Sequence, residues 1–407
     1  MKLKLKKKKL SIFGNLLILF IILMICSGWL SLNINEMFSY TDEICVIIIL
    51  IVSIIKLTQH KLKFELIDLK ILILYFIFIA IGLIGNYKSS FQTVSFAIML
   101  DIFSWSKLIL VYVLISAILI KDHIINIYLK IINLSKVFLI ITTFLAVINQ
   151  SFHLKFAGTG YSRFGLEAFA LPGNHPTYIV AILACIISLL CVEYNKNYFW
   201  IILSLIICCD TLRFKAIGYC IIMTFALFFM KDKIKKNVLI AAIISMLVVC
   251  GNNISNYFGS IETSRGIAMY TSFKIAKKFF PTGSGFGTFG TMASGKFYSK
   301  AYNIYKLSNR WGFRIDNYGY ISDGGWATQI GQFGLLGTLL FICILFQILK
   351  EILKLSINKK NILPSIALIT YLIIASSAEC PFNSDYSVIY GITLAIIRLI
   401  YKQSKTN

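Results

Sequence analysis

Three arginines stand in short polar stretches between apolar segments of the chain. Arg163 lies in AGTGYSRFGLEAF, Arg213 lies beside Lys215 in CDTLRFKAIGY, and Arg265 lies in ETSRGIAMY. A guanidinium stays charged in any environment and can donate two parallel hydrogen bonds to a phosphate. The three arginines and Lys215 are therefore candidates for one shared site that binds phosphate or diphosphate. The alternative for each is an interfacial anchor or a local ion pair.

Two titratable residues near these arginines are candidates for acid-base chemistry. Asp323 lies in NYGYISDGGWATQIGQFGLLG, just before a long apolar run, and His175 directly precedes Pro176. A carboxylate at such a place can take a proton from a hydroxyl group, with His175 as the reserve base. Asp before an apolar run is also a common helix cap, and an interfacial histidine often only marks the end of a span.

Residues 267–280 have the pattern of a basic amphipathic helix. Its predicted apolar face consists of Met269, Phe273, Ala276 and Phe280, and its predicted basic face consists of Lys274, Lys277 and Lys278. Such a helix is suited to lying on a membrane leaflet, and Lys274 and Lys278 are then candidates for binding an anionic substrate. The alternative is a surface helix whose apolar face packs on the helical bundle.

The segment that follows, PTGSGFGTFG, carries glycines at alternating positions. Gly283, Gly285 and Gly287 allow the backbone to turn tightly and to approach a ligand or another helix closely. No Lys-Ser or Lys-Thr pair follows, so the segment is not a nucleotide-binding P-loop. We treat the three glycines as candidates for substrate binding.

Composition excludes an ordinary soluble protein as the carrier of these residues. The chain is 58% hydrophobic and only 14% charged, with a mean hydropathy of +0.81. The net charge of +23 would suggest a nucleic-acid partner in a soluble chain. In a membrane protein such an excess arises because basic residues are concentrated in the cytoplasmic loops, so no nucleic acid is expected. The cysteines are scattered through apolar runs without a C-x-x-C spacing, and neither a metal site nor a cofactor is predicted.

The apolar runs predict an all-α polytopic integral membrane protein with about 12 transmembrane helices. The large polar segment at 252–326 separates the first helices, in 1–251, from the last helices, in 327–407. The predicted spans lie near 11–32, 41–57, 68–86, 104–121, 134–150, 176–194, 197–211, 214–231, 237–251, 327–349, 361–378 and 384–401.

Flanking charge predicts the orientation of these spans. The N-terminal MKLKLKKKKL is strongly basic, and no small-residue cleavage site follows it, so we expect an uncleaved first span with both termini in the cytoplasm. The other loops predicted to face the cytoplasm are then also basic, as the positive-inside rule requires. The remaining loops, including 151–175, 210–215 and 252–326, face outwards. This orientation places every candidate site residue on the outer face, and we expect the charges that do not mark topology to gather there rather than within the spans.

In this order and on this face, the motifs resemble those of the O-antigen ligase and Wzy-type polysaccharide polymerase family of bacterial envelope glycosyltransferases. The resemblance covers about residues 155–345. Arg163 and Arg265 stand where the family has its essential arginines. DTLRFKAIGY resembles a degraded T-x-SRG motif in which Phe214 replaces the glycine. The run from Arg265 to FPTGSGFGTFG resembles the family's Arg, Pro, G-x-G-x-G-x-F element.

The last matching motif bears on the difference between ligases and polymerases. Gly334 and Gly337 fit the family's G-x-x-G, and Asp323 occupies the position where ligases have histidine. The absence of that histidine favours a polymerase, because polymerases of the family often carry Asp there.

The resemblance implies an inverting transfer, without metal or cofactor, at the outer face of the bacterial cytoplasmic membrane. An oligosaccharide on undecaprenyl diphosphate would be added to another lipid-linked repeat unit, giving capsule, O-antigen or a similar polysaccharide. Arg163 and Arg265 would neutralise the departing diphosphate and Asp323 would act as the base. A flippase and a chain-length regulator are the protein partners that it implies.

Two alternatives remain open. A ligase of the same family would transfer the glycan to a lipid or protein acceptor. A flippase or transporter for the lipid-linked oligosaccharide belongs to a different class, which is expected to place charges within its spans and does not need a long outer loop.

Overall fold

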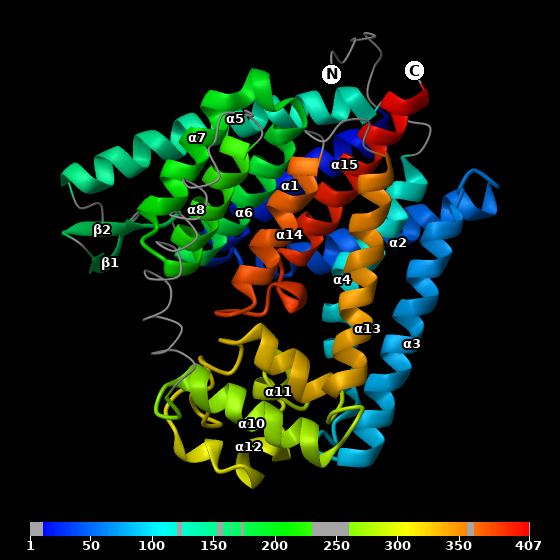
Figure 1. The fold of residues 1–407 in the computed structure, drawn as a ribbon, viewed down its shortest axis with the longest axis vertical. Helices are drawn as coiled ribbons and strands as arrows, with labels where there is room; N and C mark the ends of the chain where they lie inside the picture. The colour runs from blue at the N-terminus through cyan, green and yellow to red at the C-terminus, as the bar shows by residue number, and fades with distance from the viewer. Residues whose placement is uncertain are drawn as a thin grey trace.

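The computed structural model describes most of the chain as helices (Figure 1). Seven helices within the described residues are long and apolar enough to cross a membrane. The protein is therefore a helical membrane protein. The described residues are 11–119, 124–152, 158–163, 165–171, 175–229, 260–355 and 362–406.

The seven candidate spans use most of the predicted apolar runs. They are α1 (Ile12–Asn33), α2 (Thr41–Thr58) with the 3-10 turn before it (Glu36–Tyr40), α3 (Leu66–Ser89), α4 (Ser95–Ile118), α5 (Ile124–Phe152), α6 (Pro176–Leu190) continued by a 3-10 turn (Cys191–Glu193) and α7 (Tyr194–Asp210), and α13 (Gly325–Leu355). Three further helices are α8 (Phe214–Phe229), α14 (Leu363–Ala375) and α15 (Ser387–Thr406). Every predicted span on described residues coincides with a helix, and the span predicted at 237–251 lies outside them.

The helical architecture agrees with the predicted all-α class, and a small antiparallel sheet accompanies it. Strand β1 (Gly158–Arg163) pairs with β2 (Leu166–Phe169), and Arg163 lies opposite Leu166. The hairpin is anchored on the end of α5, because the Gln150 side chain donates to the Glu167 carbonyl at 2.7 Å and accepts from the Glu167 N–H at 3.2 Å. The chain at Gly165 has a φ of +77°, a conformation that glycine adopts without strain.

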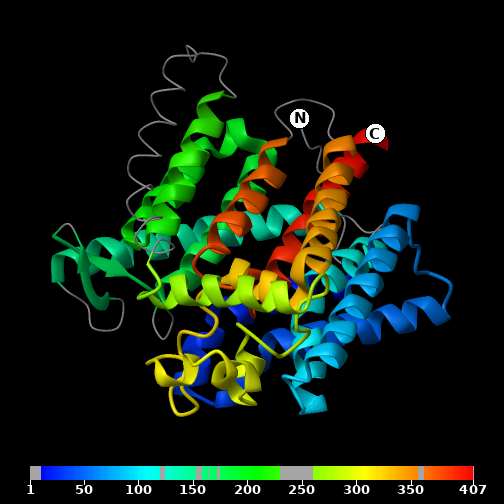
Figure 2. The ribbon, with the colours of Figure 1, turned by 60° about the horizontal axis from the view of Figure 1, so that its bottom comes forward.

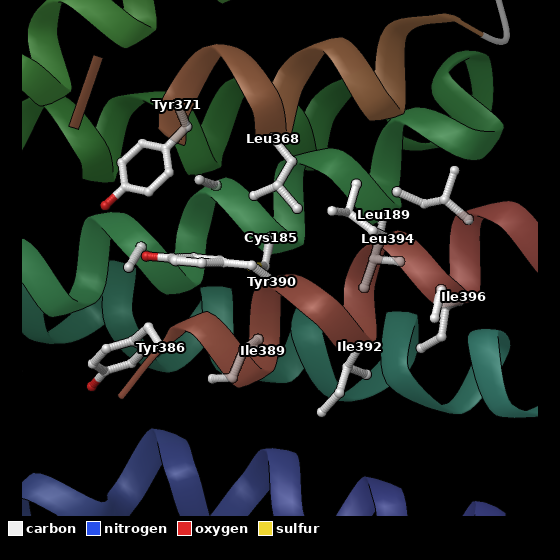
Figure 3. Close-up of a cluster of buried hydrophobic side chains, with 14 of the residues drawn as sticks. Cys185, Leu189, Leu368, Tyr371, Tyr386, Ile389, Tyr390, Ile392, Leu394 and Ile396 are labelled. Atoms are coloured by element: carbon white, nitrogen blue, oxygen red, sulfur yellow. The ribbon is translucent and has the colours of Figure 1, made fainter. Parts of the chain in front are cut away.

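The core of the bundle lies between α15 and its neighbours α4, α6 and α14. Figure 3 shows Tyr371 of α14 and Cys185 of α6 beside Tyr390 of α15. Nearly every side chain of α6 is buried, as expected for a helix that is apolar on all sides. The central helices therefore form a rigid support for the loops at their ends.

The segment 281–290, called the glycine loop below, enters the bundle and interrupts α13. The backbone N–H groups of Ser284 and Gly285 donate to the carbonyls of Gly331 and Gln332, at 3.1 and 2.7 Å. Directly after these carbonyls α13 departs from helical geometry. The loop thus takes the hydrogen-bond acceptors that the helix would otherwise use.

Helices α3 and α4 hold the glycine loop through buried polar side chains. The Asn86 amide donates to the Phe286 carbonyl at 2.7 Å and accepts from the Phe286 N–H at 2.8 Å. The Asp101 carboxylate accepts from the Gly287 N–H at 2.7 Å and from Gln332 Nε2 at 2.9 Å. Buried backbone groups outside a helix need hydrogen-bond partners, and these side chains supply them.

Residues 260–324 form a folded unit, called the lobe below, at one end of the bundle (Figures 1 and 2). Its helices are α10 (Ser264–Lys278), α11 (Met292–Lys296) and α12 (Lys300–Ile304), followed by a 3-10 turn (Leu307–Asn309). The lobe has its own hydrophobic cluster, which includes Ile275, Phe289, Tyr302 and Phe313. The described part of the predicted long loop is therefore ordered.

The apolar face predicted for α10 is not the face that packs on the bundle. The helix packs against α13 through Ala268, Thr271 and Ile275, whereas Phe273 and Phe280 of the predicted apolar face are exposed. The structure therefore does not support the alternative in which the predicted apolar face packs on the helical bundle.

Charged residues also lie inside the bundle, which corrects the expectation that they gather outside. Lys107 of α4 pairs with Asp42 and, at 2.7 Å, with Glu43, both of α2. Arg398 of α15 pairs with Asp68 and with Glu65 near the start of α3. Such charges are expensive to bury alone, so each is held by partners on another helix.

Candidate functional site

Arg163 and Arg213 lie together where β1 meets the turn between α7 and α8. Arg163 Nη1 donates to the Leu212 carbonyl at 3.3 Å, and its Nη2 donates to the Tyr161 hydroxyl. The Arg163 guanidinium carbon lies 4.0 Å from the ring centre of Phe214, and that of Arg213 lies 5.9 Å from the ring centre of Tyr161. Aromatic faces attract these cations and hold them side by side despite their mutual repulsion.

His175 joins this pair of arginines from the start of α6. Its Nε2 lies 3.0 Å from Nη2 of Arg213, and its Nδ1 lies 2.9 Å from Oγ1 of Thr177. Because a guanidinium only donates, Nε2 accepts the bond from Arg213. The backbone N–H of Thr177 lies 3.3 Å from Nδ1, so the His175 ring also caps the first turn of α6. Desolvation and the charges of Arg213 and Lys215 lower the pKa of His175 to about 4. The ring is neutral at pH 7 and works as a hydrogen-bond acceptor for Arg213.

Lys215 pairs with a carboxylate from the other side of the site. Its Nζ lies 2.6 Å from Oε2 of Glu379, in the turn after α14, and Tyr371 donates to Oε1 of Glu379 at 3.2 Å. The Lys215 side chain is almost fully buried, and the ion pair compensates the cost of burying its charge.

Arg265 and Asp323 bring the lobe to the same place. Arg265 Nη2 lies 3.6 Å from Oδ2 of Asp323, and Arg265 Nε donates to the Asp323 carbonyl at 3.2 Å. Both side chains are partly exposed. The carboxylate is thus fixed beside a cation while one side stays open to a ligand.

Helix capping does not account for Asp323. α13 begins at Gly325, so the capping position is Gly324. The first free N–H groups of α13 donate instead to backbone carbonyls, Gly325 to Glu379 at 2.9 Å and Trp326 to Ser376 at 3.0 Å. The carboxylate of Asp323 faces Arg265. The structure therefore does not support the helix-capping role that the sequence also allowed.

These residues share one electrostatic environment, which we call the basic cluster. Its members are Arg163, His175, Arg213, Lys215, Arg265, Asp323 and Glu379. Desolvation raises the pKa of Asp323 above its ordinary value; Arg265, Lys215 and Arg213 each oppose that shift, and Glu379 adds to it. The cations outnumber the carboxylates, so the cluster can accept an anion with several charges and offers it a carboxylate of raised basicity.

The glycines predicted to bind substrate lie elsewhere, inside the bundle. A Cβ atom on Gly283 would lie 2.4 Å from the backbone nitrogen of Gly334, and one on Gly285 would lie 2.3 Å from that of Asn86. One on Gly287 would lie 3.1 Å from the Ala97 carbonyl. The sequence left open whether these glycines approach a ligand or another helix, and the distances show that they approach other helices.

Lys274 and Lys278 also lie apart from the basic cluster. Lys274 Nζ lies 4.3 Å from the ring centre of Tyr270, and Lys278 Nζ lies 5.4 Å from that of Phe279. At about 1.5 Å per residue, Lys274 is roughly 13 Å along α10 from Arg265. The structure therefore does not place these lysines with the arginines.

Two members of the neighbourhood, Glu379 and Tyr161, were missed at the sequence level. Glu379 lies in a predicted outer loop that also faces the arginines, and an acidic residue among outer cations was the available signal. Nothing in the spacing of Tyr161 distinguishes it from the other tyrosines. Within the described residues, no three His, Cys, Asp or Glu side chains lie together in a way that would hold a metal ion.

Comparison with known proteins assigns no relative to the chain. No protein-family model matches it, and no curated protein sequence matches it significantly. The function therefore has to be inferred from the chemistry of the basic cluster and from the motifs that surround it.

Proposed function

We propose that the protein is a membrane glycosyltransferase that polymerises oligosaccharide repeat units carried on undecaprenyl diphosphate. The observation that carries the proposal is the convergence of Arg213 and Arg265 on the Asp323 carboxylate, with Arg163 near Arg213 on the Tyr161 side. The arginines come from the β1–β2 hairpin, the α7–α8 turn and the lobe. Such convergence from distant segments is expected for a ligand site and is not required by packing.

The donor's diphosphate suits these cations. A glycosyl diphosphate gains negative charge on the oxygen that leaves, and preorganised guanidinium groups stabilise that charge as it develops. Arg265 and Arg163 would carry this role, with Arg213 and Lys215 completing the anion site. The basic cluster lies at the ends of α6, α8 and α13, where a lipid carrier can present its headgroup while its tail stays in the bilayer.

Asp323 would accept the proton in the transfer step. The acceptor hydroxyl oxygen bonds to the anomeric carbon, and the anomeric bond to the diphosphate breaks with inversion. The electron pair of that bond leaves with the diphosphate, and the hydroxyl proton passes to the Asp323 carboxylate. Its raised pKa suits this task, because a general base works best when its pKa is close to the working pH.

The motif order of the chain supports the same proposal. It resembles the O-antigen ligase and Wzy-type polymerase family, and Asp323 in place of a histidine favours the polymerase over the ligase. The proposed setting is the outer face of a bacterial cytoplasmic membrane, with about 12 spans.

A flippase for the same lipid-linked oligosaccharide is the second candidate. The observation that favours it is the buried pairing of Lys107 with Asp42 and Glu43 inside the bundle, since transporters carry charged groups within their spans. A flippase moves its substrate between leaflets and has no activity in detergent, whereas a polymerase makes product there.

The test uses the purified full-length protein in detergent with a lipid-linked repeat unit. Wild-type protein is expected to give a ladder of longer glycans, and Arg265→Ala and Arg163→Ala are expected to abolish it at unchanged protein levels. Arg314→Ala, at an exposed arginine elsewhere on the lobe, is the matched control and should retain the ladder. Wild-type chain lengths from either cluster variant would overturn the proposal, and transfer to a lipid or protein acceptor would indicate a ligase.

A further inference from the structure

Helix α10 exposes a continuous stripe of aromatic and basic side chains. Tyr270, Phe273, Lys274 and Lys277 recur at helical spacing on the exposed side, and Phe280 follows beyond the end of the helix. The Tyr270, Phe273 and Phe280 side chains are 44%, 57% and 65% exposed. Contiguous exposed aromatic residues usually mark an interaction surface.

The charge of this stripe has one sign. The helix sequence SRGIAMYTSFKIAKK contains no acidic residue, and its last turn carries Lys277 and Lys278. Lys274 lies over the ring of Tyr270, so the basic and aromatic groups belong to a single surface. A partner for it should combine an apolar layer with negative charge.

The end of α10 lies at the connection between two candidate spans, α3 and α4. Phe91, in the connection between them, packs against Phe279 with ring centroids 5.0 Å apart, and Lys278 Nζ lies 5.9 Å from the Phe91 ring centre. Tyr87 and Phe96, at the ends of the two spans, are 88% and 60% exposed. Aromatic side chains concentrate at the depth of the lipid headgroups, so this connection marks that depth.

The orientation of α10 agrees with this depth. In Figure 2 the yellow-green α10 runs across the end of the bundle, and in Figure 1 it lies beside the end of α3. At its C-terminal end the helix adjoins the span ends through the contacts of Phe279 and Lys278 with Phe91.

We propose that the exposed stripe of α10 docks on the headgroup layer of the adjacent leaflet and binds anionic phospholipid. Tyr270, Phe273 and Phe280 would enter the boundary between headgroups and acyl chains, and the lysines would attract the negative headgroups. The contact would fix the depth of Arg265, which lies at the N-terminal end of the same helix. The proposal does not depend on the glycosyltransferase assignment.

The test is photo-crosslinking of the full-length protein in bilayers. Benzoylphenylalanine replaces Phe273 in one variant and Phe280 in another, and each protein is reconstituted in phosphatidylcholine containing phosphatidylglycerol. Both variants should crosslink to phospholipid, with phosphatidylglycerol enriched over its share of the bilayer. A folded protein that crosslinks at neither position to lipid, or that crosslinks to a second protein chain instead, overturns the proposal.

Lysine variants test the charge. Lys274→Gln with Lys277→Gln should lower the enrichment of phosphatidylglycerol at Phe273 on the order of fivefold or more, from the attraction expected per lysine at an anionic surface. The matched control is Lys296→Gln with Lys306→Gln, at two exposed lysines elsewhere on the lobe, and it should retain the enrichment. An equal loss in both double variants would show that net charge, not the stripe, attracts the lipid, and would overturn the site.

Discussion

Arg265 contacts Asp323 twice, through Oδ2 of the carboxylate at 3.6 Å and through the backbone carbonyl at 3.2 Å. Arg265 lies in the first turn of α10 and Asp323 stands just before α13, so the pair joins the beginning of the lobe to its end. The two contacts set both the position and the direction of the carboxylate. An anion that binds Arg265 therefore arrives within reach of the group proposed to take the proton.

Asp323→Asn is expected to lower the rate of glycan transfer on the order of 100-fold or more, because an amide cannot take up the acceptor's proton. The measurement is the initial rate with saturating lipid-linked repeat unit, in detergent. The apparent KM for the donor should change little, since the arginines remain. If the Asp323→Asn variant transfers glycan at the wild-type rate, Asp323 is not the base and serves only to position Arg265.

The pH profile of transfer should respond in opposite directions to two neutralising variants. A base must be deprotonated, so activity is lost as the pH falls through the pKa of Asp323, which lies above its ordinary value. Glu379 contributes to that rise and Arg213 opposes it. Glu379→Gln should therefore move the acid limb to lower pH and Arg213→Gln should move it to higher pH. Shifts in the same direction would exclude Asp323 as the titrating group.

The thermal stability of the protein should fall as the pH drops from about 6.5 towards about 4. The folded protein holds the pKa of His175 near 4, so in this window the unfolded chain binds a proton that the folded protein does not. His175→Gln should show a weaker pH dependence of the melting temperature between those limits. If the pH dependence of the melting temperature is unchanged in this variant, a group other than His175 titrates in this window.

Gly285→Ala should destabilise the fold by about 2–5 kcal/mol. The new Cβ would be strained in the left-handed backbone conformation, and it would also clash with neighbouring atoms. The residue has a φ of +94°, and the new Cβ would lie 2.3 Å from the nitrogen of Asn86. Gly319→Ala is the matched control, because a Cβ there meets no atom within 4 Å. Unfolding titrations in mixed micelles should separate the two variants, and equal stabilities would contradict the packing of the glycine loop.

The helices on the described apolar runs could be predicted from the sequence because a long continuous apolar run favours a membrane helix. The nearness of Arg213 and Lys215 to Arg265 could be expected for a similar reason. Their loops fall on one predicted side of the membrane, and a bundle end is small enough to bring such loops together.

Pairings between distant helices could not be predicted in this way. Lys107 finds Asp42 and Glu43 on α2, more than 60 positions earlier in the chain, and no local pattern encodes that contact. The face of α10 that packs on α13 could not be predicted, because residues such as Ala268 and Thr271 carry little hydrophobic signal. The β1–β2 hairpin was missed because its strands are too short to show alternation.

The glycine loop also sets an order of events in biosynthesis. Asn86 precedes its partner Phe286 by 200 residues, and Asp101 precedes Gly287 by 186. At about 5–20 residues per second, α3 and α4 leave the ribosome roughly 10–40 s before the loop that satisfies them. During that interval the membrane-insertion machinery or water has to shelter their polar side chains, so the bundle closes only after the lobe has been made.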